Sequence, residues 1–207
     1  IIAAFDGLKY SLQTQEYAIS LASKNKALLV GVFLNNLNYH SYKIYDIISE
    51  KEGGIDAKLQ GKLNKKDNFA RAKAIKTFES ACRKAGIQFS VHSDEFAAIR
   101  ELICESIYAD LLVINRNETF NRYKEELPTS FIHGFLPHVQ CPVFVVPSSC
   151  RQIDEVVLLY DGEPSSVHAI KMLNYVLPSF QNLYSEIVTV SKAGRRSQLP
   201  ASTLIRE

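Results

Sequence analysis

Two short, uninterrupted apolar runs constrain the fold of this chain more than any other feature of its sequence. Residues 111–114 (Leu-Leu-Val-Ile) and 143–146 (Val-Phe-Val-Val) contain no polar residue. Runs of this length without polar alternation are typical of parallel strands that helices cover on both faces. Ligands of open parallel sheets bind beyond the carboxyl ends of the strands. The polar loop 115–128, which follows the first run, therefore lies where a binding site is expected.

Apolar spacing elsewhere predicts the remaining elements of the same sheet. Strands are predicted at 1–5, 27–34 and 87–91, and helices at 11–24, 68–84, 96–108 and 129–138. Ser11 is the expected N-cap of the first helix, and Gly86 suits a C-terminal cap of the second. Residues 35–66 are expected to form a long, partly helical excursion. Strands that alternate with helices predict right-handed crossovers and an α/β fold.

Composition places the chain among ordinary globular proteins. Its 207 residues, 46% hydrophobic and 22% charged, suffice for one full core and part of a second. A net charge of +2 gives no support for a nucleic-acid or membrane partner. Because no apolar run reaches about 18 residues, no transmembrane helix is expected. The first residues resemble a core strand more than a leader, so we expect a cytoplasmic protein.

The start of the chain recurs in its last quarter. Residues 1–7 (Ile-Ile-Ala-Ala-Phe-Asp-Gly) align with residues 156–162 (Val-Val-Leu-Leu-Tyr-Asp-Gly), and Ser166 then aligns with Ser11 ahead of a similar helix at 167–177. A second strand is predicted at 184–190. Repetition at fixed spacing indicates a tandem arrangement. We therefore expect a complete α/β domain at 1–149 and a partial second repeat at 150–207.

Several short motifs, taken in their order, resemble the universal stress protein family in its tandem form. They are Asp-Gly at 6–7 with Ser11, Ala-Asp at 109–110, and Cys-Pro-Val at 141–143. The resemblance implies a doubly wound, parallel five-stranded sheet of order 3-2-1-4-5, similar to flavodoxin and Rossmann folds. It also implies a stress-linked regulatory or binding role and dimerisation through the last strand.

One branch of that family binds ATP through a glycine-rich loop, and this sequence departs from it. The family pattern is Gly-x-x-Gly, nine further residues, and Gly-Ser or Gly-Thr. The corresponding residues here are Arg116 (or Asn115), Thr119 and Thr129-Ser130, so only the serine remains. Backbone N–H groups that approach phosphate closely favour glycine, because a Cβ is costly there. Glu118, Glu125 and Glu126 also bring carboxylates to the phosphate position, although Arg116, Arg122 and Lys124 balance their charge.

These departures leave two hypotheses for function. The first is a non-catalytic regulatory protein with a degenerate nucleotide loop, which acts through protein contacts. The second is a stress sensor that binds ATP or AMP, for which the resemblance implies the ligand positions Asp6, Val32, Asn115 and Ser130. A simpler interpretation of Asp6 and Asp161 is that each caps the turn that follows its strand.

The sequence also bears on partners, catalysis and metal binding. The fifth strand, at 143–146, is expected at the edge of the sheet. An apolar edge strand needs a partner, so we expect a homodimer or a pseudo-dimer with the second repeat. The chain has no Gly-x-Ser-x-Gly elbow, and no carboxylate or cysteine stands at ligand spacing from His133 or His138, so neither catalytic nor metal residues are expected. The cluster of Tyr39, Tyr42, Tyr45 and Ile48 is either a partner surface or a lid packed on the sheet.

Overall fold

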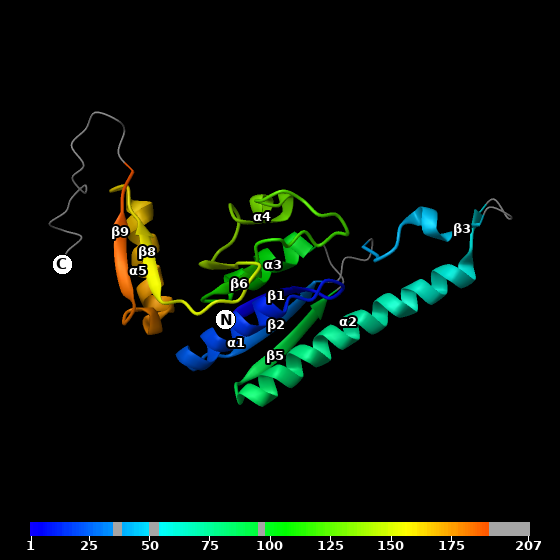
Figure 1. Ribbon diagram of the computed structural model, residues 1–207, viewed down its shortest axis with the longest axis horizontal. Coiled ribbons are helices and arrows are strands. Elements are labelled where there is room, and N and C mark those ends of the chain that lie inside the picture. The colour runs from blue at the N-terminus through cyan, green and yellow to red at the C-terminus, as the bar shows by residue number, and fades with distance from the viewer. Residues whose placement is uncertain (35–38, 50–53, 95–97, 191–207) are drawn as a thin grey trace. The chain divides into compact units, whose positions relative to one another are not determined.

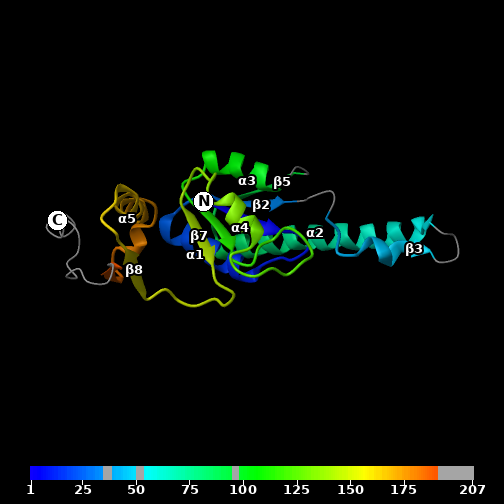
Figure 2. The same ribbon diagram turned by 90° about the horizontal axis from the view of Figure 1, so that it is seen from above.

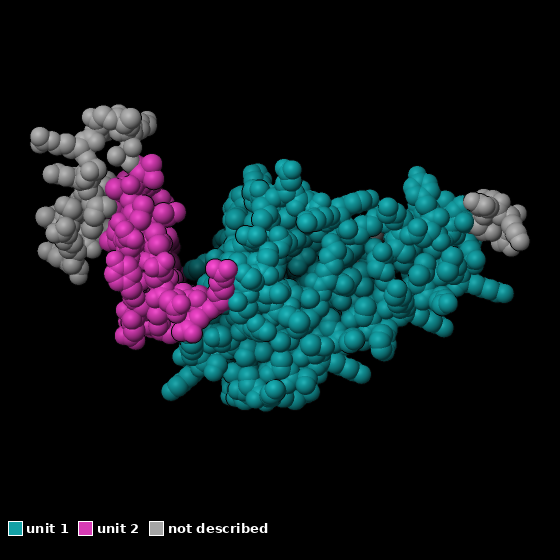
Figure 3. Space-filling view, in the orientation of Figure 1, with its two compact units in different colours: residues 1–150 teal, residues 151–207 magenta. Residues whose placement is uncertain are grey.

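The computed structural model describes residues 1–34, 39–49, 54–94 and 98–190. The chain divides into two compact units, Ile1–Cys150 and Arg151–Glu207 (Figure 3). The first unit contains a five-stranded parallel sheet formed by β1 (Ile2–Asp6), β2 (Leu29–Leu34), β5 (Phe89–Asp94), β6 (Leu112–Asn115) and β7 (Val143–Val146). Its order, β5-β2-β1-β6-β7, is 3-2-1-4-5 when the strands are counted along the chain. The predicted fold class is confirmed.

Helices cover both faces of this sheet (Figure 1). They are α1 (Leu12–Asn25), α2 (Ala57–Ala85), α3 (Ala98–Ile107) and α4 (Ser130–Phe135). α1 and α2 contact each other on one face, and α3 and α4 contact each other on the other. Alternation along the central strands separates two cores: Phe5 and Phe33 meet Phe78 of α2, whereas Ala4 and Val32 belong to the cluster that includes α3 and α4.

The predicted caps explain where two helices begin and end. Ser11 is the N-cap of α1, and its hydroxyl oxygen accepts a hydrogen bond from the Thr14 N–H at 3.1 Å. Gly86 is the C-cap of α2 with φ +67°, in the left-handed region that favours glycine. Both cap predictions are confirmed.

The prediction for α2 was wrong at its beginning, because the helix starts at Ala57 and not at residue 68. Asp56 is the N-cap, and its Oδ1 accepts hydrogen bonds from the Lys58 and Leu59 N–H groups. The N-terminal half of α2 projects beyond the sheet in both views (Figures 1 and 2). Few of its residues face a core, so apolar periodicity could not reveal it.

The excursion that precedes α2 is held against this projecting half by polar contacts. It contains η1 (Ile44–Ile47) and the short antiparallel pair β3 (Ile48–Ser49) and β4 (Gly54–Ile55). The Tyr42 hydroxyl donates to Asn64 Oδ1 at 2.6 Å, and the Ser41 N–H donates to the buried Asp67 carboxylate at 3.0 Å. These contacts fix residues 39–47 beside α2.

The second unit is a single strand-helix-strand element. It consists of β8 (Glu155–Leu159), α5 (Pro164–Val176), η2 (Pro178–Phe180) and β9 (Tyr184–Val188), with β8 and β9 parallel. Every residue of β1 is buried, whereas no residue of β8 is. β1 and β8, whose sequences align, therefore differ in how completely they are buried.

The turn after β8 shows what the repeated Asp-Gly pair does. Asp161 Oδ1 accepts hydrogen bonds from the Glu163 N–H at 2.9 Å and from the Ser166 hydroxyl at 2.7 Å. Asp161 therefore caps the turn, as one of the two interpretations predicted. Ser166 does not precede the helix as expected, because Pro164 at the first helical position starts α5 earlier, with Glu163 as N-cap. Among the described residues, no helix has the length and apolar character needed to cross a membrane.

Candidate functional site

The structure places two of the four predicted site residues at neighbouring strand ends. Asp6 ends β1 and Asn115 ends β6, and these strands pair in the sheet. Ser130 is the first residue of α4, beyond the loop 115–128. Val32 lies inside β2, between Ala4 and His92 of the adjacent strands, and is 0% exposed. Asp6, Asn115 and Ser130 thus place polar groups at the carboxyl edge of the sheet, whereas Val32 is part of the core.

The Asn115 side chain connects the site loop to α1. Its Nδ2 donates to Ser11 Oγ at 2.9 Å, and its Oδ1 accepts from the Asn117 N–H at 2.9 Å. Both ends of the amide therefore have a protein partner. Ser11, which the sequence identified as a helix cap and as part of the family motif, is also the residue that positions Asn115.

Both hydrogen-bond donors of Ser130 bind a carboxylate of the same loop. Its N–H and its hydroxyl both donate to Glu125 Oε2, at 2.7 and 2.6 Å. The other carboxylate oxygen of Glu125 accepts from Asn121 Nδ2 at 3.1 Å. The Ser130 hydroxyl, its backbone N–H and the Asn121 amide together lower the pKa of Glu125. Glu125 is therefore held as an anion on the donors that the resemblance assigns to a phosphate.

Glu118 lies inside the same loop and is only 5% exposed. Its Oε1 accepts hydrogen bonds from the Thr119 N–H at 3.0 Å and from the Phe120 N–H at 3.2 Å. Burial, and after it the negative charge of Asp6, raises the pKa of Glu118 to about 7. The sequence predicted a carboxylate at the phosphate position but did not predict that it would be buried.

Asp6 is the second buried carboxyl of the site, at 1% exposure. Its Oδ1 accepts from the Leu8 N–H at 2.8 Å and the Lys9 N–H at 3.3 Å, which is the geometry of a turn cap. Burial raises the pKa of Asp6, and its hydrogen bonds, one of which comes from Tyr39, oppose that rise. Asp6 and Glu118 therefore form a pair of electrostatically coupled carboxyls at the end of the sheet.

Lys9 is the cation that faces this carboxyl pair. Its charge lowers the pKa of both Asp6 and Glu118. Its ammonium group donates to Thr119 Oγ1 at 3.5 Å and to the Asn121 carbonyl. Lys9 therefore ties the turn after β1 to the loop 115–128 while it offsets part of the negative charge.

Phe120 closes the apolar side of the loop. Its φ is +45°, a region that bulky side chains rarely adopt. The ring is 4% exposed and contacts Phe131 edge-on, with 4.4 Å between the ring centroids. Phe120 belongs to the same buried cluster as Val32. A side chain of the loop therefore fills part of the apolar core that contains Val32, one of the predicted ligand positions.

Thr129 anchors the far end of the loop. Its hydroxyl donates to the Glu118 carbonyl at 2.6 Å and accepts from the Ile132 N–H at 3.3 Å as the N-cap of α4. We expect Thr129→Ala to lower the free energy of unfolding by about 1 to 2 kcal/mol, because a buried carbonyl and a helix N–H lose their partner. Urea denaturation checks this. Thr77→Ala, which removes a hydroxyl bonded to the Lys73 carbonyl inside α2, is the control and should change stability by less than about 0.5 kcal/mol.

The chemistry available at the site is that of an internally satisfied polar loop. Among the described residues, no group of three or more His, Cys, Asp or Glu side chains could hold a metal ion. The two donors of Ser130 and both ends of the Asn115 amide already bond to the protein. An incoming anion would have to displace a carboxylate that the chain itself supplies.

Comparisons with known proteins identify the fold. No protein-family model matches the sequence. No curated protein matches it either. A solved universal stress protein from Archaeoglobus fulgidus is similar over 100% of this chain and 72% of its own, with a TM-score of 0.62 and 16% identity. The predicted resemblance to universal stress proteins is thereby confirmed at the level of the fold.

Two further solved structures match the chain less closely. A universal stress family protein from Burkholderia pseudomallei covers 70% of this chain and 94% of its own, with 19% identity and a TM-score of 0.42. A universal stress family protein from Arabidopsis thaliana, solved with AMP bound, covers 72% of this chain and 92% of its own, with 12% identity and a TM-score of 0.41. At these similarities neither structure bears on the ligand of this chain.

Proposed function

We propose that this chain is a non-catalytic, universal stress protein-like regulator that acts through protein contacts and has lost its nucleotide site. The observation that carries the proposal is the Glu125 carboxylate on the N–H and hydroxyl of Ser130. These are the donors that a nucleotide phosphate needs at the start of α4. An intramolecular anion has no translational entropy to lose on binding, so it competes strongly with a free one.

The buried carboxyl pair supports the same conclusion. Asp6 and Glu118 are 1% and 5% exposed, and each carries a raised pKa because of burial. A phosphate placed beside them would add negative charge where even the existing carboxyls resist ionisation. Lys9, the cation that faces them, already bonds to the loop. The electrostatics of the site thus oppose a nucleotide.

An isothermal titration with ATP and Mg²⁺, and a second with AMP, tests this proposal. We expect no heat of binding with the wild-type chain. Glu125→Ala should show weak binding, because it frees both donors of Ser130. Glu126→Ala, which removes an exposed carboxylate of the same loop, is the control and should behave as the wild type.

The competing function is adenine-nucleotide sensing. Micromolar binding of ATP or AMP by the wild-type chain, weakened by Asp6→Ala, would contradict the proposal and support a rebuilt phosphate loop around Asp6, Val32, Asn115 and Ser130.

The proposed contact surface is the open edge of the sheet at β7. β7 is the last strand in the sheet order, so one side of its backbone has no strand partner within the described sheet. Val145 is 42% exposed there. Exposed apolar edge strands tend to pair with another strand. We propose that a second copy of the chain supplies that strand, with the second unit of the same chain as the alternative.

Sedimentation velocity over a range of concentrations distinguishes the two sources of the strand. We expect the wild-type chain to dimerise as its concentration rises, and Val145→Asp to reduce that association, because it places a charge in an apolar interface. Tyr108→Asp, at a side chain that is 90% exposed after α3, serves as the control and should dimerise normally. A wild-type chain that stays monomeric throughout would contradict pairing between copies.

A further inference from the structure

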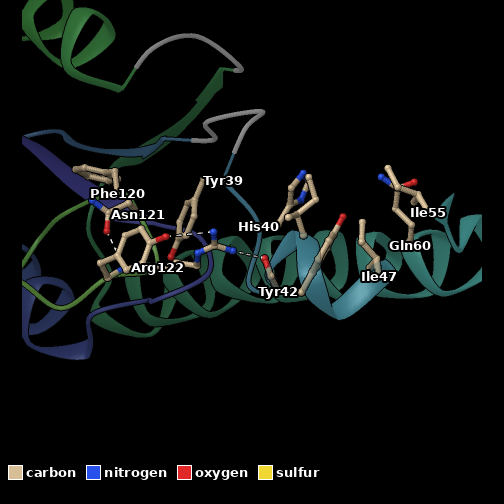
Figure 4. A pocket seen from close by; sticks show the side chains of 11 residues that line it. Tyr39, His40, Tyr42, Ile47, Ile55, Gln60, Phe120, Asn121 and Arg122 are labelled. Carbon is tan, nitrogen blue, oxygen red and sulfur yellow. Dashed lines mark hydrogen bonds between the residues drawn. The ribbon is translucent and has the colours of Figure 1, made fainter. Parts of the chain in front are cut away.

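A cavity lies next to the predicted nucleotide site and shares Phe120 and Asn121 of the loop 115–128 with it. It has a volume of about 430 Å³ and is lined by none of Asp6, Val32, Asn115 and Ser130. Its walls come from three segments: residues 39–47, the β4–α2 junction through Ile55 and Gln60, and the loop 120–123 (Figure 4). Pockets that bind small molecules are typically 300 to 1,000 Å³. The cavity is thus large enough for a compact organic ligand.

Hydrogen bonds to α2 hold the first wall in place. Arg71 donates to the Tyr39 carbonyl at 2.7 Å, the Ser41 N–H donates to Asp67, and the Tyr42 hydroxyl donates to Asn64 at 2.6 Å. Each of these partners projects from the same long helix. A wall fixed in this way is formed before a ligand arrives, which lowers the entropic cost of binding.

Five of the eleven residues that line the cavity have aromatic rings. The His40 ring stacks on Tyr42, with 4.9 Å between centroids and 22° between the planes. Tyr39 and Phe120 are 7% and 4% exposed, so their rings are firmly packed. Figure 4 shows the His40 and Tyr42 side chains next to each other, with the Arg122 guanidinium between them and Tyr39. Flat, rigid side chains of this kind favour a planar ring as ligand.

Arg122 provides the charge of the cavity. Its NH1 group donates to the Tyr42 carbonyl at 2.7 Å and its NH2 group to the Tyr123 hydroxyl at 3.3 Å. A guanidinium carries five N–H donors, so these two bonds fix its orientation and leave others for a ligand. None of the described residues that line the cavity is Asp or Glu. The guanidinium therefore has no carboxylate partner within the lining.

From these features we propose that the cavity binds a small planar aromatic anion. The ring lies against Tyr39, His40 and Tyr42, and the anionic group accepts hydrogen bonds from Arg122. Guanidinium groups bind carboxylates and phosphates in the same planar, two-point geometry. The inference does not rest on the proposed function, because none of the four predicted nucleotide ligands lines the cavity.

A titration with 2-naphthoate, followed by amide chemical shifts in two-dimensional NMR, tests the proposal. We expect saturable shifts confined to residues 39–47 and 120–123 and to the first turns of α2. The neutral analogue 2-naphthylmethanol should bind about tenfold more weakly or worse, because it lacks the charge that Arg122 recognises. Equal affinity for the two compounds, or shifts elsewhere, would overturn the proposal.

Two substitutions separate the charge of Arg122 from its geometry. Arg122→Gln should weaken 2-naphthoate at least about tenfold, and Arg122→Lys should weaken it less, because lysine keeps the charge but not the paired donors. Arg116→Gln is the matched control, since Arg116 lies on the same loop and bonds to Ser148 outside the cavity. An Arg122→Gln chain that keeps wild-type amide positions elsewhere, and still binds 2-naphthoate as tightly as the Arg116→Gln chain, would refute the assignment.

Discussion

Gly31→Ala is expected to destabilise the first unit by about 1 to 3 kcal/mol, because the core against α2 has no room for another methyl group. A Cβ at residue 31 would lie 2.6 Å from Cε1 and 2.8 Å from Cζ of Phe78. Phe78 is 0% exposed and packs against the rings of Phe5 and Phe33, so it cannot move aside freely. Urea denaturation of the two chains measures the difference.

A double-mutant cycle shows whether the clash with Phe78 is the cause. Phe78→Ala alone should cost about 3 to 5 kcal/mol. In that background Gly31→Ala should cost little or become favourable, because the cavity left by the ring accepts the methyl group. Gly61→Ala is the control. Gly61 lies inside α2 and a Cβ there would have no atom within 4 Å, so the substitution should be neutral or stabilising. A Gly31→Ala chain as stable as the Gly61→Ala chain would contradict this packing.

The second large effect concerns pH. Glu118 has a folded-state pKa of about 7, above its ordinary value of 4.5, because it is buried and lies near Asp6. Between those two pH values the folded chain keeps a proton that the unfolded chain has lost. Stability should therefore fall as pH rises from about 4.5 to about 7, by roughly 2 to 3 kcal/mol, and should not fall further from this source.

Glu118→Gln isolates this contribution. An uncharged amide can still accept hydrogen bonds from the Thr119 and Phe120 N–H groups, but it no longer ionises. Denaturation near pH 5 and pH 8 should show a flatter profile for Glu118→Gln and a more stable chain at the higher pH. Glu126→Gln, at an exposed position of the same loop, should keep the wild-type profile. Equal slopes for the wild type and Glu118→Gln would show that Glu118 ionises normally.

The central strands could be predicted from the sequence because β1, β2 and β6 are almost wholly buried. The edge strand β7 is only partly buried, although its apolar run predicted cover on both faces. The apolar run at 143–146 coincides with β7, the run at 111–114 overlaps β6 (Leu112–Asn115), and the strand order is the one expected. The two caps of α1 and α2 followed from the local chemistry of Ser11 and Gly86. Apolar runs and capping residues are both patterns of residues that lie close together in the sequence, so a single sequence is enough to recognise them.

Other features depend on contacts that periodicity does not encode. The first half of α2 is held by its N-cap Asp56 and by polar contacts of Asn64 and Asp67 with residues 41–42. It therefore has no apolar stripe from which the sequence could predict it. The three glutamates of the site loop were recognised as carboxylates near a phosphate position. Which of them is buried, and which binds Ser130, is decided by the three-dimensional course of the loop.

The backbone N–H of Ser130 reports most directly on whether Glu125 keeps a nucleotide out, because it is the donor to which Glu125 binds. We would follow its NMR signal in the wild-type chain while ATP and Mg²⁺ are added. We expect that the signal does not move at millimolar ATP, and that it moves in Glu125→Ala. A saturable shift of the Ser130 signal in the wild-type chain would show that a nucleotide displaces Glu125, and would rule out the loss of the nucleotide site.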